Sequence, residues 1–290
     1  MNQPTKPLTA GETALIVGAG GKTGRRVAEQ LAEQDVQVRA ASRSGSTRFD
    51  WNDASTWEPA LRGADAAYVT YSPDLAVPEA PEAIREFSRL AAAHDLGRVV
   101  LLSGRGEEEA QRCEEIFQGV RRDWTVVRAS WFNQNFSEGY FLPPLQQGTL
   151  ALPAGNIAEP FIDVDDIADV AVAALTGPGH EGRIYEVTGP RLLTFADAVR
   201  EIGAAAGREL NFVQVPAEGY AREMEAQQVP KVIIDLTRYL FETVLDGRNA
   251  KISDGVRQAL GREPRDFADY AARAAATGIW AEGQANPSAS

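Results

Sequence analysis

A glycine-rich turn between an apolar run and a helical stretch constrains the fold of this chain more than any other feature. The apolar run Thr13-Ala-Leu-Ile-Val17 leads directly into Gly18-Ala-Gly-Gly-Lys-Thr-Gly24, and helical periodicity follows over residues 22–34. Strand, glycine turn and helix in this order are typical of a dinucleotide site. Glycine permits the tight turn, brings backbone N–H groups close to a pyrophosphate, and lets the helix pack on the strand. The phosphates would lie at the helix N-terminus, which favours anions. We therefore assign six residues to the cofactor: Gly18, Gly20, Gly21, Lys22, Thr23 and Gly24.

The end of the second predicted strand, residues 36–41, favours NADP(H) over NAD(H). Sites that prefer NAD place an Asp or Glu about 20 residues after the glycines to hold the ribose 2′-hydroxyl. Here no carboxylate occurs between Asp35 and Asp50. Arg43 can instead pair with a 2′-phosphate, and Ser42 and Ser44 can donate their hydroxyls to it. The alternative is that Arg43 is a solvated loop residue.

Composition excludes several classes of function. The 290 residues are 44% hydrophobic, which is enough for a large core, and the formal net charge is -12. That charge argues against non-specific binding to nucleic acids or anionic membranes, because both would repel the chain. Cys113 is the single cysteine and only two histidines occur, so we predict neither an internal disulfide nor a metal site. With no apolar leader or long apolar run, we expect a cytoplasmic protein.

Strand and helix signals alternate through the first half of the chain, and this pattern predicts an α/β fold with a Rossmann-type, doubly wound parallel sheet. A dinucleotide-binding core is expected over residues 12–155, rejoined by a strand at 183–187. A smaller and mainly helical substrate lobe is expected over 156–282, with flexible ends at 1–11 and 283–290. We expect strands at 13–17, 36–41, 66–70, 98–102 and 124–128, and helices at 22–34, 54–61, 79–93, 107–119, 167–175, 195–206 and 231–245.

Ligands of open parallel sheets bind outside the carboxyl ends of the strands, so the residues that follow each strand are further candidates. Asp50 and Trp51 either contact the adenine or form a turn with a packing aromatic. Asn133 and Asn135 lie among three aromatic residues, a mixture that lines apolar pockets with polar anchors, although core packing of the aromatics is the alternative. The cofactor set therefore also takes in Thr70, Tyr71, Ser72 and Ser103, and the substrate set is Trp131, Phe132, Asn133 and Phe136.

Several of these segments resemble one protein family over nearly the whole chain. Together with the glycine turn and Ser42-Arg43, the stretches Ala129-Ser-Trp-Phe-Asn-Gln-Asn135 and Phe161-Ile-Asp-Val-Asp-Asp-Ile-Ala168 resemble the NmrA-like branch of the atypical short-chain dehydrogenases. Within it, residues 38–44 and Phe49-Asp-Trp51 resemble bacterial relatives of ergot-alkaloid iminium reductases. The resemblance implies a Rossmann core, a smaller carboxyl-terminal lobe, NADP(H) along the strand ends and a substrate between core and lobe. The family also includes quinone reductases, antibiotic-tailoring proteins and redox-sensing regulators.

The acid pair of typical short-chain dehydrogenases is missing from the sequence. Those enzymes use a Tyr and a Lys one helical turn apart to protonate a carbonyl as hydride arrives. No tyrosine here has a lysine four residues later. An iminium carbon or a quinone is already electrophilic, so it needs orientation and desolvation more than an acid. If catalysis occurs, Thr70, Tyr71, Ser103 and Asn135 are the expected orienting groups, with Tyr71 the best hydrogen-bond donor or, alternatively, a half-buried packing residue.

Two acidic runs are interpreted structurally. Asp163, Asp165 and Asp166 precede a helix, so capping and the helix dipole explain them better than a cation site. Residues Glu107 to Glu109 also begin a helix, and we interpret them as a solvated run that complements its dipole.

Three functions remain open. The first is an NADPH-dependent reductase of a small or mid-sized apolar or polycyclic electrophile of secondary metabolism, such as an iminium or quinone-like compound. The second is a regulator that binds NADP(H) without turnover and controls a protein partner. The third is a tailoring enzyme that uses the scaffold for ring oxidation or rearrangement. The missing Tyr–Lys pair fits all three, and the oligomeric state, a homodimer included, stays open.

Overall fold

The computed structural model describes residues 6–120 and 123–282, which form two compact units described here one at a time. The first unit comprises Met1–Ala129, Asp165–Val187 and Asp254–Arg262, and the second comprises Ser130–Val164, Thr188–Ser253 and Glu263–Ser290. This division differs from the expected boundary between residues 155 and 156. The chain leaves the sheet at Ala129, where a strand ends. It returns with the helix that begins at Val164.

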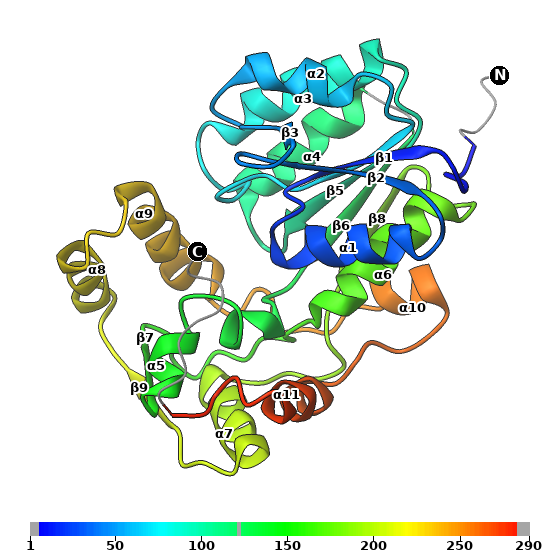
Figure 1. Cartoon of the computed structure of the whole chain (residues 1–290). Helices are drawn as coiled ribbons and strands as arrows, with labels where there is room; N and C mark the ends of the chain where they lie inside the picture. Colours follow the sequence, from blue (N-terminus) through cyan, green and yellow to red (C-terminus); the bar gives the residue numbers. More distant parts are fainter. Residues whose placement is uncertain (1–5, 121–122, 283–290) are drawn as a thin grey trace. The chain divides into compact units, whose positions relative to one another are not determined.

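The first unit is built on a seven-stranded sheet in which every strand is parallel to its neighbours, with the order β3-β2-β1-β4-β5-β6-β8 (Figure 1). This is the predicted α/β Rossmann-type fold. Strand β8 pairs with β6, so the chain after residue 164 contributes to the same sheet. The strands are β1 (Thr13–Val17), β2 (Gln37–Ser42), β3 (Thr47–Arg48), β4 (Ala66–Val69), β5 (Val99–Gly104), β6 (Trp124–Ala129) and β8 (Arg183–Val187).

Helices cover both faces of this sheet, as a parallel sheet requires. Strands β1 and β4 send Leu15 and Val69 into a core shared with Phe87 and Phe117 of the helices on one face. In Figure 1, α2, α3 and α4 lie on that face, and α1 and α6 lie on the other. The helices of this unit are α1 (Lys22–Ala32), α2 (Trp57–Leu61), α3 (Ala80–Ala93), α4 (Glu108–Val120), α6 (Val164–Thr176) and α10 (Gly255–Leu260), with a short 3-10 turn η1 (Ala54–Thr56) before α2.

The start of the described chain is fixed rather than flexible from residue 8 onward. Leu8 is buried, and its N–H donates to the carbonyl oxygen of Leu175 at 3.0 Å. Glu12 accepts hydrogen bonds from Thr9 and from Lys6. The expectation of a flexible segment over 1–11 therefore does not hold for these residues. Residues 1–5 and the tail 283–290, which shared that expectation, lie outside the described part of the chain.

The second unit surrounds an aromatic core. Phe136 has no exposed surface and packs edge-on against Phe161, with ring centroids 5.6 Å apart, and against Phe267 at 5.7 Å. Its small sheet pairs two strands in parallel, and Trp280 closes the core through an indole N–H that donates to the Phe136 carbonyl. The elements are η2 (Asn133–Phe136), α5 (Leu142–Gln146), β7 (Thr149–Leu152), α7 (Phe195–Ala206), β9 (Asn211–Gln214), α8 (Ala217–Ala226), α9 (Lys231–Tyr239), a π-helical turn η3 (Leu240–Val244) and α11 (Phe267–Ala276).

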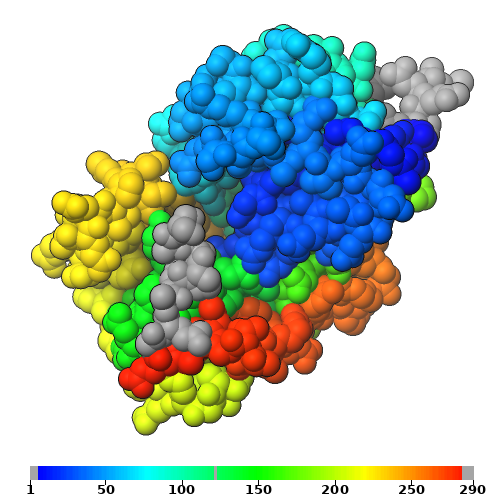
Figure 2. Space-filling view, in the orientation of Figure 1, coloured from blue at the N-terminus to red at the C-terminus, as the bar shows by residue number. Residues whose placement is uncertain are grey.

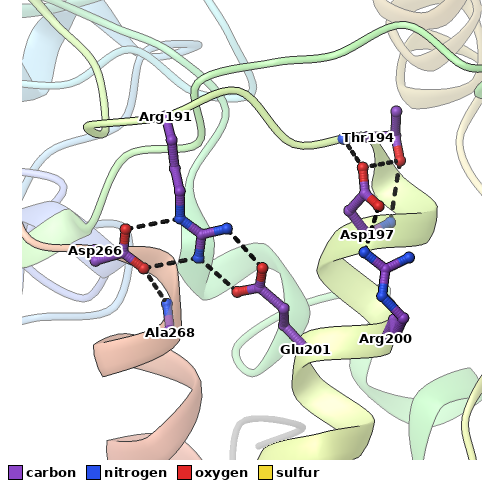
Figure 3. A network of polar contacts seen from close by, with 7 residues as sticks. All are labelled: Arg191, Thr194, Asp197, Arg200, Glu201, Asp266 and Ala268. Atoms are coloured by element: carbon purple, nitrogen blue, oxygen red, sulfur yellow. Dashed lines mark hydrogen bonds and ion pairs between the residues drawn. The ribbon is translucent and has the colours of Figure 1, made fainter.

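A network centred on Arg191 joins two helices of this unit (Figure 3). Its guanidinium donates to both carboxylate oxygens of Glu201 on α7, each at 2.6 Å, and to both of Asp266, each at 2.7 Å. Asp266 in turn accepts the N–H of Ala268 and so caps α11. Because each carboxylate receives two parallel bonds, the geometry is the strong bidentate form. One arginine therefore fixes α7 and α11 to the same loop.

In the space-filling view the amino-terminal third of the chain, coloured blue to cyan, forms a continuous surface of the first unit (Figure 2). Among residues 6–120 and 123–282, no helix has the length and apolar character that crossing a membrane requires.

Candidate nucleotide-binding and active site

The turn between β1 and α1 is shaped by glycines at its two ends. Gly18 has a φ of +80°, and a Cβ there would lie 2.1 Å from Thr70 Oγ1. A Cβ at Gly24 would lie 2.2 Å from the carbonyl oxygen of Gly18. Thr70 approaches Gly18, and the Gly18 carbonyl approaches Gly24, so closely that only glycine fits at these two positions.

The middle of the turn is open. A Cβ at Gly20 would meet no heavy atom within 4 Å. Gly21 is the N-cap of α1 and provides no side-chain cap. The first N–H groups of a helix have no acceptor within the helix, so an uncapped start offers backbone donors to an anion. The Thr23 side chain, by contrast, is buried and faces Tyr68. Of Thr23, only the backbone is placed to contact a phosphate.

The residues after β2 present a basic and hydroxyl-rich surface. Arg43 and Ser44 are exposed, and Ser42 is half-buried. Within the described ranges, no side chain of these three forms a hydrogen bond or ion pair with another residue. Strand β2 pairs directly with β1, so its end lies one strand away from the glycine turn. Arg43 is therefore available to a phosphate placed beside that turn.

Asp50 and Trp51 are engaged in local contacts, which favour the turn-and-packing alternative. The Asp50 carboxylate accepts the N–H of Asn52 at 3.0 Å. The Trp51 ring packs 4.9 Å from that of Phe49 and 4.8 Å from that of Tyr71, and its indole N–H donates to the Thr70 carbonyl. Trp51 thereby ties the segment after β3 to the end of β4.

The residues after β4 face the glycine turn. Thr70 donates its hydroxyl to the Val17 carbonyl at 3.1 Å, directly beside Gly18. Ser72 is exposed, and Tyr71 is half-buried. Burial, assisted by the charge of Glu79, raises the pKa of Tyr71 above its usual value. Tyr71 can therefore donate a hydrogen bond at neutral pH but is a weaker acid than an ordinary tyrosine.

Ser103, at the end of β5, is bound into a buried polar network. It is only 4% exposed, and its hydroxyl donates to Glu114 Oε1 at 2.6 Å. Glu114 also accepts Arg128 Nε at 3.0 Å. The proton of Ser103 is thus directed to a carboxylate on α4 rather than toward a ligand in this structure.

The predicted substrate residues belong to the second unit and divide into two groups. Phe136 lies in the core without exposed surface, so packing explains it. Trp131 is half-buried, with its ring centroid 5.3 Å from Phe195 and 5.2 Å from Phe241. Phe132 is also half-buried and accepts the Asn135 N–H through its carbonyl.

Asn133 has an unusual environment for a buried amide. Its side chain has no exposed surface, and neither the oxygen nor the nitrogen has a partner among the described residues. Such groups cost about 1 to 3 kcal/mol each, so they are rarely left unused. Asn135 is half-buried nearby in sequence. Asn133 is therefore the strongest candidate in the second unit for contact with a ligand.

The aspartates at the start of α6 include two in its first turn, as the dipole interpretation expects, and they are also ion-pair partners. Asp163 is fully buried and accepts Gln134 Nε2 at 2.7 Å and Arg273 Nη2 at 2.6 Å. Asp166 is also fully buried, 2.7 Å from Arg262. The sequence-based interpretation was capping and the helix dipole, and it did not include these partners because they lie far along the chain.

Glu107 is the main site feature that sequence reasoning missed. It was expected in a solvated run, yet it is only 7% exposed. Burial raises the pKa of Glu107 well above its usual value, and the charge of Asp74 adds to the effect. No local pattern could reveal this environment, because Glu107 and Asp74 follow different strands.

Comparison with known proteins agrees with this geometry. Residues 18–178, more than half of the chain, match the family model described as NAD(P)H-binding. The oxidoreductase YesF of Bacillus subtilis is 33% identical over 92% of this chain and 98% of its own length. Agroclavine dehydrogenase of Claviceps fusiformis is 30% identical over 89% of this chain and 96% of its own.

Solved structures support the same fold. An NADPH-dependent quinone oxidoreductase of Escherichia coli, solved with NADPH, superposes with a TM-score of 0.71 over 90% of this chain and 99% of its own, at 18% identity. The family match confirms the nicotinamide cofactor as NAD(P)H. Its relatives include clavine dehydrogenases and other reductases. The chain therefore belongs to the NAD(P)H-binding family of NmrA-like, atypical short-chain dehydrogenases and reductases.

Proposed function

We propose that this chain is an NADPH-dependent reductase that transfers hydride to an activated acceptor, an iminium or quinone-like compound of secondary metabolism. The observation that carries the proposal is the pairing of an open glycine turn with an exposed and unengaged arginine. Gly20 leaves space for a phosphate, and Arg43 extends from the end of the adjacent strand. A guanidinium there suits the 2′-phosphate that distinguishes NADPH from NADH. When bound, the cofactor would supply the hydride.

The chemistry of the sheet edge supports an acceptor that is already electrophilic. Helix α4, which would carry a Tyr–Lys pair, contains neither residue type. The Ser103 hydroxyl is committed to Glu114, and the raised pKa of Tyr71 makes that residue a poor acid. Orientation and exclusion of water would then contribute most to the rate. Tyr71 and Thr70 are the groups that we assign to orientation.

We infer that Trp131, Asn133 and Asn135 contact the substrate. A half-buried indole provides an apolar surface, and a buried amide with both atoms unused provides one donor and one acceptor. Apolar pockets with a few polar anchors bind small ligands in this way. This combination favours a substrate with a flat apolar body and at least one polar atom.

Titration and turnover measurements test the proposal. We expect NADPH to bind more tightly than NADH, and we expect NADPH to be oxidised when a quinone or an N-alkyl dihydroisoquinolinium salt is added. As a control for the role of Arg43, the variant Arg222→Ala removes an arginine of α8. This variant should leave the affinities for NADPH and NADH unaltered. Equal affinity for the two cofactors would refute the assignment of Arg43. Tight binding without turnover of either acceptor would refute the reductase and favour a regulator.

A further inference from the structure

Asn133 carries a buried and unused amide in the second unit. Its side chain has no exposed surface, and neither its oxygen nor its nitrogen has a hydrogen-bond partner among the described residues. The next residue, Gln134, uses both ends of its amide, because Nε2 donates to Asp163 Oδ1 at 2.7 Å and Oε1 accepts the Val164 N–H at 2.9 Å. The surroundings therefore offer partners to one amide and none to its neighbour.

The backbone fixes the direction in which the Asn133 amide projects. Ile162 donates its N–H to the Trp131 carbonyl and accepts the N–H of Asn133, both at 2.8 Å. Between them, Phe132 is extended, with a φ of -79° and a ψ of 134°. Alternate side chains of an extended segment point to the same side. The Asn133 amide and the Trp131 ring therefore lie on one side of this segment, and Phe132 lies on the other.

Trp131 begins a row of three aromatic rings, which we call the aromatic row and which consists of Trp131, Phe241 and Tyr220. The ring centroids of Trp131 and Phe241 are 5.2 Å apart, and those of Phe241 and Tyr220 are 6.3 Å apart. Trp131 and Tyr220 are half-buried, and Phe241 is buried. The three residues come from the segment after β6, from η3 and from α8. Three distant parts of the chain thus bring apolar ring surface to the side that carries the amide.

The two helices next to the aromatic row are the least anchored helices of the second unit. Helices α8 and α9 lie side by side (Figure 1). Each contributes one buried residue, Ala221 in α8 and Ile234 in α9, whereas α7 contributes five. Segments with few buried contacts open at a low free energy. Tyr220 can therefore move with α8 and admit a ligand to the aromatic row and the amide behind it.

The chemistry of the amide defines the ligand that would complete it. A buried donor or acceptor without a partner destabilises a fold, so native chains rarely keep one without a use. The edge of the Asn133 amide presents one N–H donor and one carbonyl acceptor. A cyclic amide, or lactam, presents the complementary carbonyl and N–H side by side. A ligand with a carbonyl alone would satisfy the donor of Asn133 and leave its acceptor unpaired.

We propose that the Asn133 amide and the aromatic row form a subsite for a planar ring that carries a lactam edge. This inference rests on the proposed reductase function and specifies its acceptor further. The flat body of the ligand lies along the aromatic row, and its lactam edge forms two hydrogen bonds with Asn133. Asparagine recognises the edge of adenine through two hydrogen bonds of the same kind. Asn133 is therefore the residue that selects the edge, and the aromatic row selects the flat body.

Three non-reducible probes of similar shape test the selection of the edge. Isoquinolone is a planar lactam, isocoumarin has an oxygen in place of its N–H, and N-methylisoquinolone has a methyl group on that nitrogen. Isothermal titration of the full chain should show that isoquinolone binds about tenfold more tightly than either analogue, as paired amide edges discriminate. Equal affinities for the three probes, or binding of none, would overturn the proposal.

Asn133→Leu is the decisive variant, because leucine has a similar size and no polar side-chain atom. It should weaken isoquinolone about tenfold and remove the preference among the probes. Asn156→Leu changes an exposed asparagine of the same unit and should keep the preference. Tyr220→Leu, which shortens the aromatic row, should weaken all three probes about fivefold and keep their order. A preference for isoquinolone that persists in Asn133→Leu would overturn the role of Asn133.

Thermal unfolding without ligand gives a readout in which a structural asparagine would behave differently. Asn133→Leu removes two unpaired polar atoms, so the variant should melt at the same temperature as the wild type or higher. A melting temperature several degrees lower would show that the amide has a partner within the chain, and this too would overturn the proposal.

The outcomes separate the subsite from the reductase. If the chain binds isoquinolone selectively but oxidises NADPH with neither a quinone nor a dihydroisoquinolinium salt, the subsite stands as a ligand site and the reductase fails. If the chain reduces both acceptors and shows no preference for the lactam, the subsite fails and the reductase stands.

Discussion

The glycine turn of the first unit and the Arg191 network of the second unit achieve precision by opposite means. The turn relies on its backbone, because Gly18 and Gly24, which lie within seven consecutive positions, leave no room for a Cβ. The network uses side chains, and its arginine joins Glu201 to Asp266 on another helix. Constraints on the backbone are local, so they leave a spacing pattern in the sequence. Side-chain contacts can join residues whose separation in the sequence follows no pattern.

We expect the largest effect when a side chain is placed in the glycine turn. Gly24→Val should destabilise the chain by about 3 kcal/mol and abolish binding of NADPH, because its Cβ would overlap the Gly18 carbonyl. Denaturant unfolding and NADPH titration measure the two effects. Gly20→Ala is the matched control, since its Cβ meets nothing within 4 Å, and it should fold normally. Normal NADPH binding by Gly24→Val would disprove the role of close helix packing.

Removal of the Arg191 network should have a smaller effect, confined to the stability of the fold. Arg191→Met leaves two carboxylates without their bidentate partner, and we expect a loss of about 2 kcal/mol in the free energy of unfolding. NADPH affinity should stay within about twofold, since the cofactor contacts that we propose lie in the first unit. Arg200→Met, which removes a surface pair with Asp197, should cost about 0.5 kcal/mol or less. If the two variants lost equal stability, the network would have no special importance.

A charge reversal next to the glycine turn should alter the preference between NADPH and NADH without altering the backbone. Arg43→Asp should weaken binding of NADPH about tenfold, which corresponds to about 1.4 kcal/mol, and should leave the affinity for NADH similar or higher. Since the Arg43 side chain is exposed and forms no hydrogen bond or ion pair with a described residue, the melting temperature should hardly change. Isothermal titration with both cofactors gives the answer, and an unchanged ratio of affinities would contradict it.

The smallest expected effect concerns pH and the buried Glu107. A pKa raised in the folded state means that the folded chain binds more protons than the unfolded chain, so stability falls as pH rises from about 5 through the raised pKa. Glu107→Gln removes that dependence and should be about 1 kcal/mol more stable than the wild type near pH 9. Thermal unfolding of both proteins across pH measures it. Parallel curves would show that Glu107 is ionised in both states.

The sequence was sufficient to predict the sheet and the glycine turn, since both depend on local sequence patterns. The predicted strand 13–17 is β1 without adjustment, and most helices of the first unit agree within a few residues. The short strands β3, β7 and β9 were not expected, and they are only two to four residues long. Glu107 was placed in solvent, since its position before a helix explains it equally well without Asp74. The unused amide of Asn133 likewise has no signature in the sequence.

The position of α10 has a consequence for how the chain is made. This helix follows β8 only after the long segment 188–254, yet it packs on β8, with Gly255 so close that a Cβ would lie 2.2 Å from the Glu186 carbonyl oxygen. A nascent chain that leaves the ribosome from its amino end must therefore expose one side of β8 until residues 255–260 have also been translated. Truncation before Gly255 would remove this cover, so chaperones that bind unfinished chains would have an exposed strand to bind after β8 has been made.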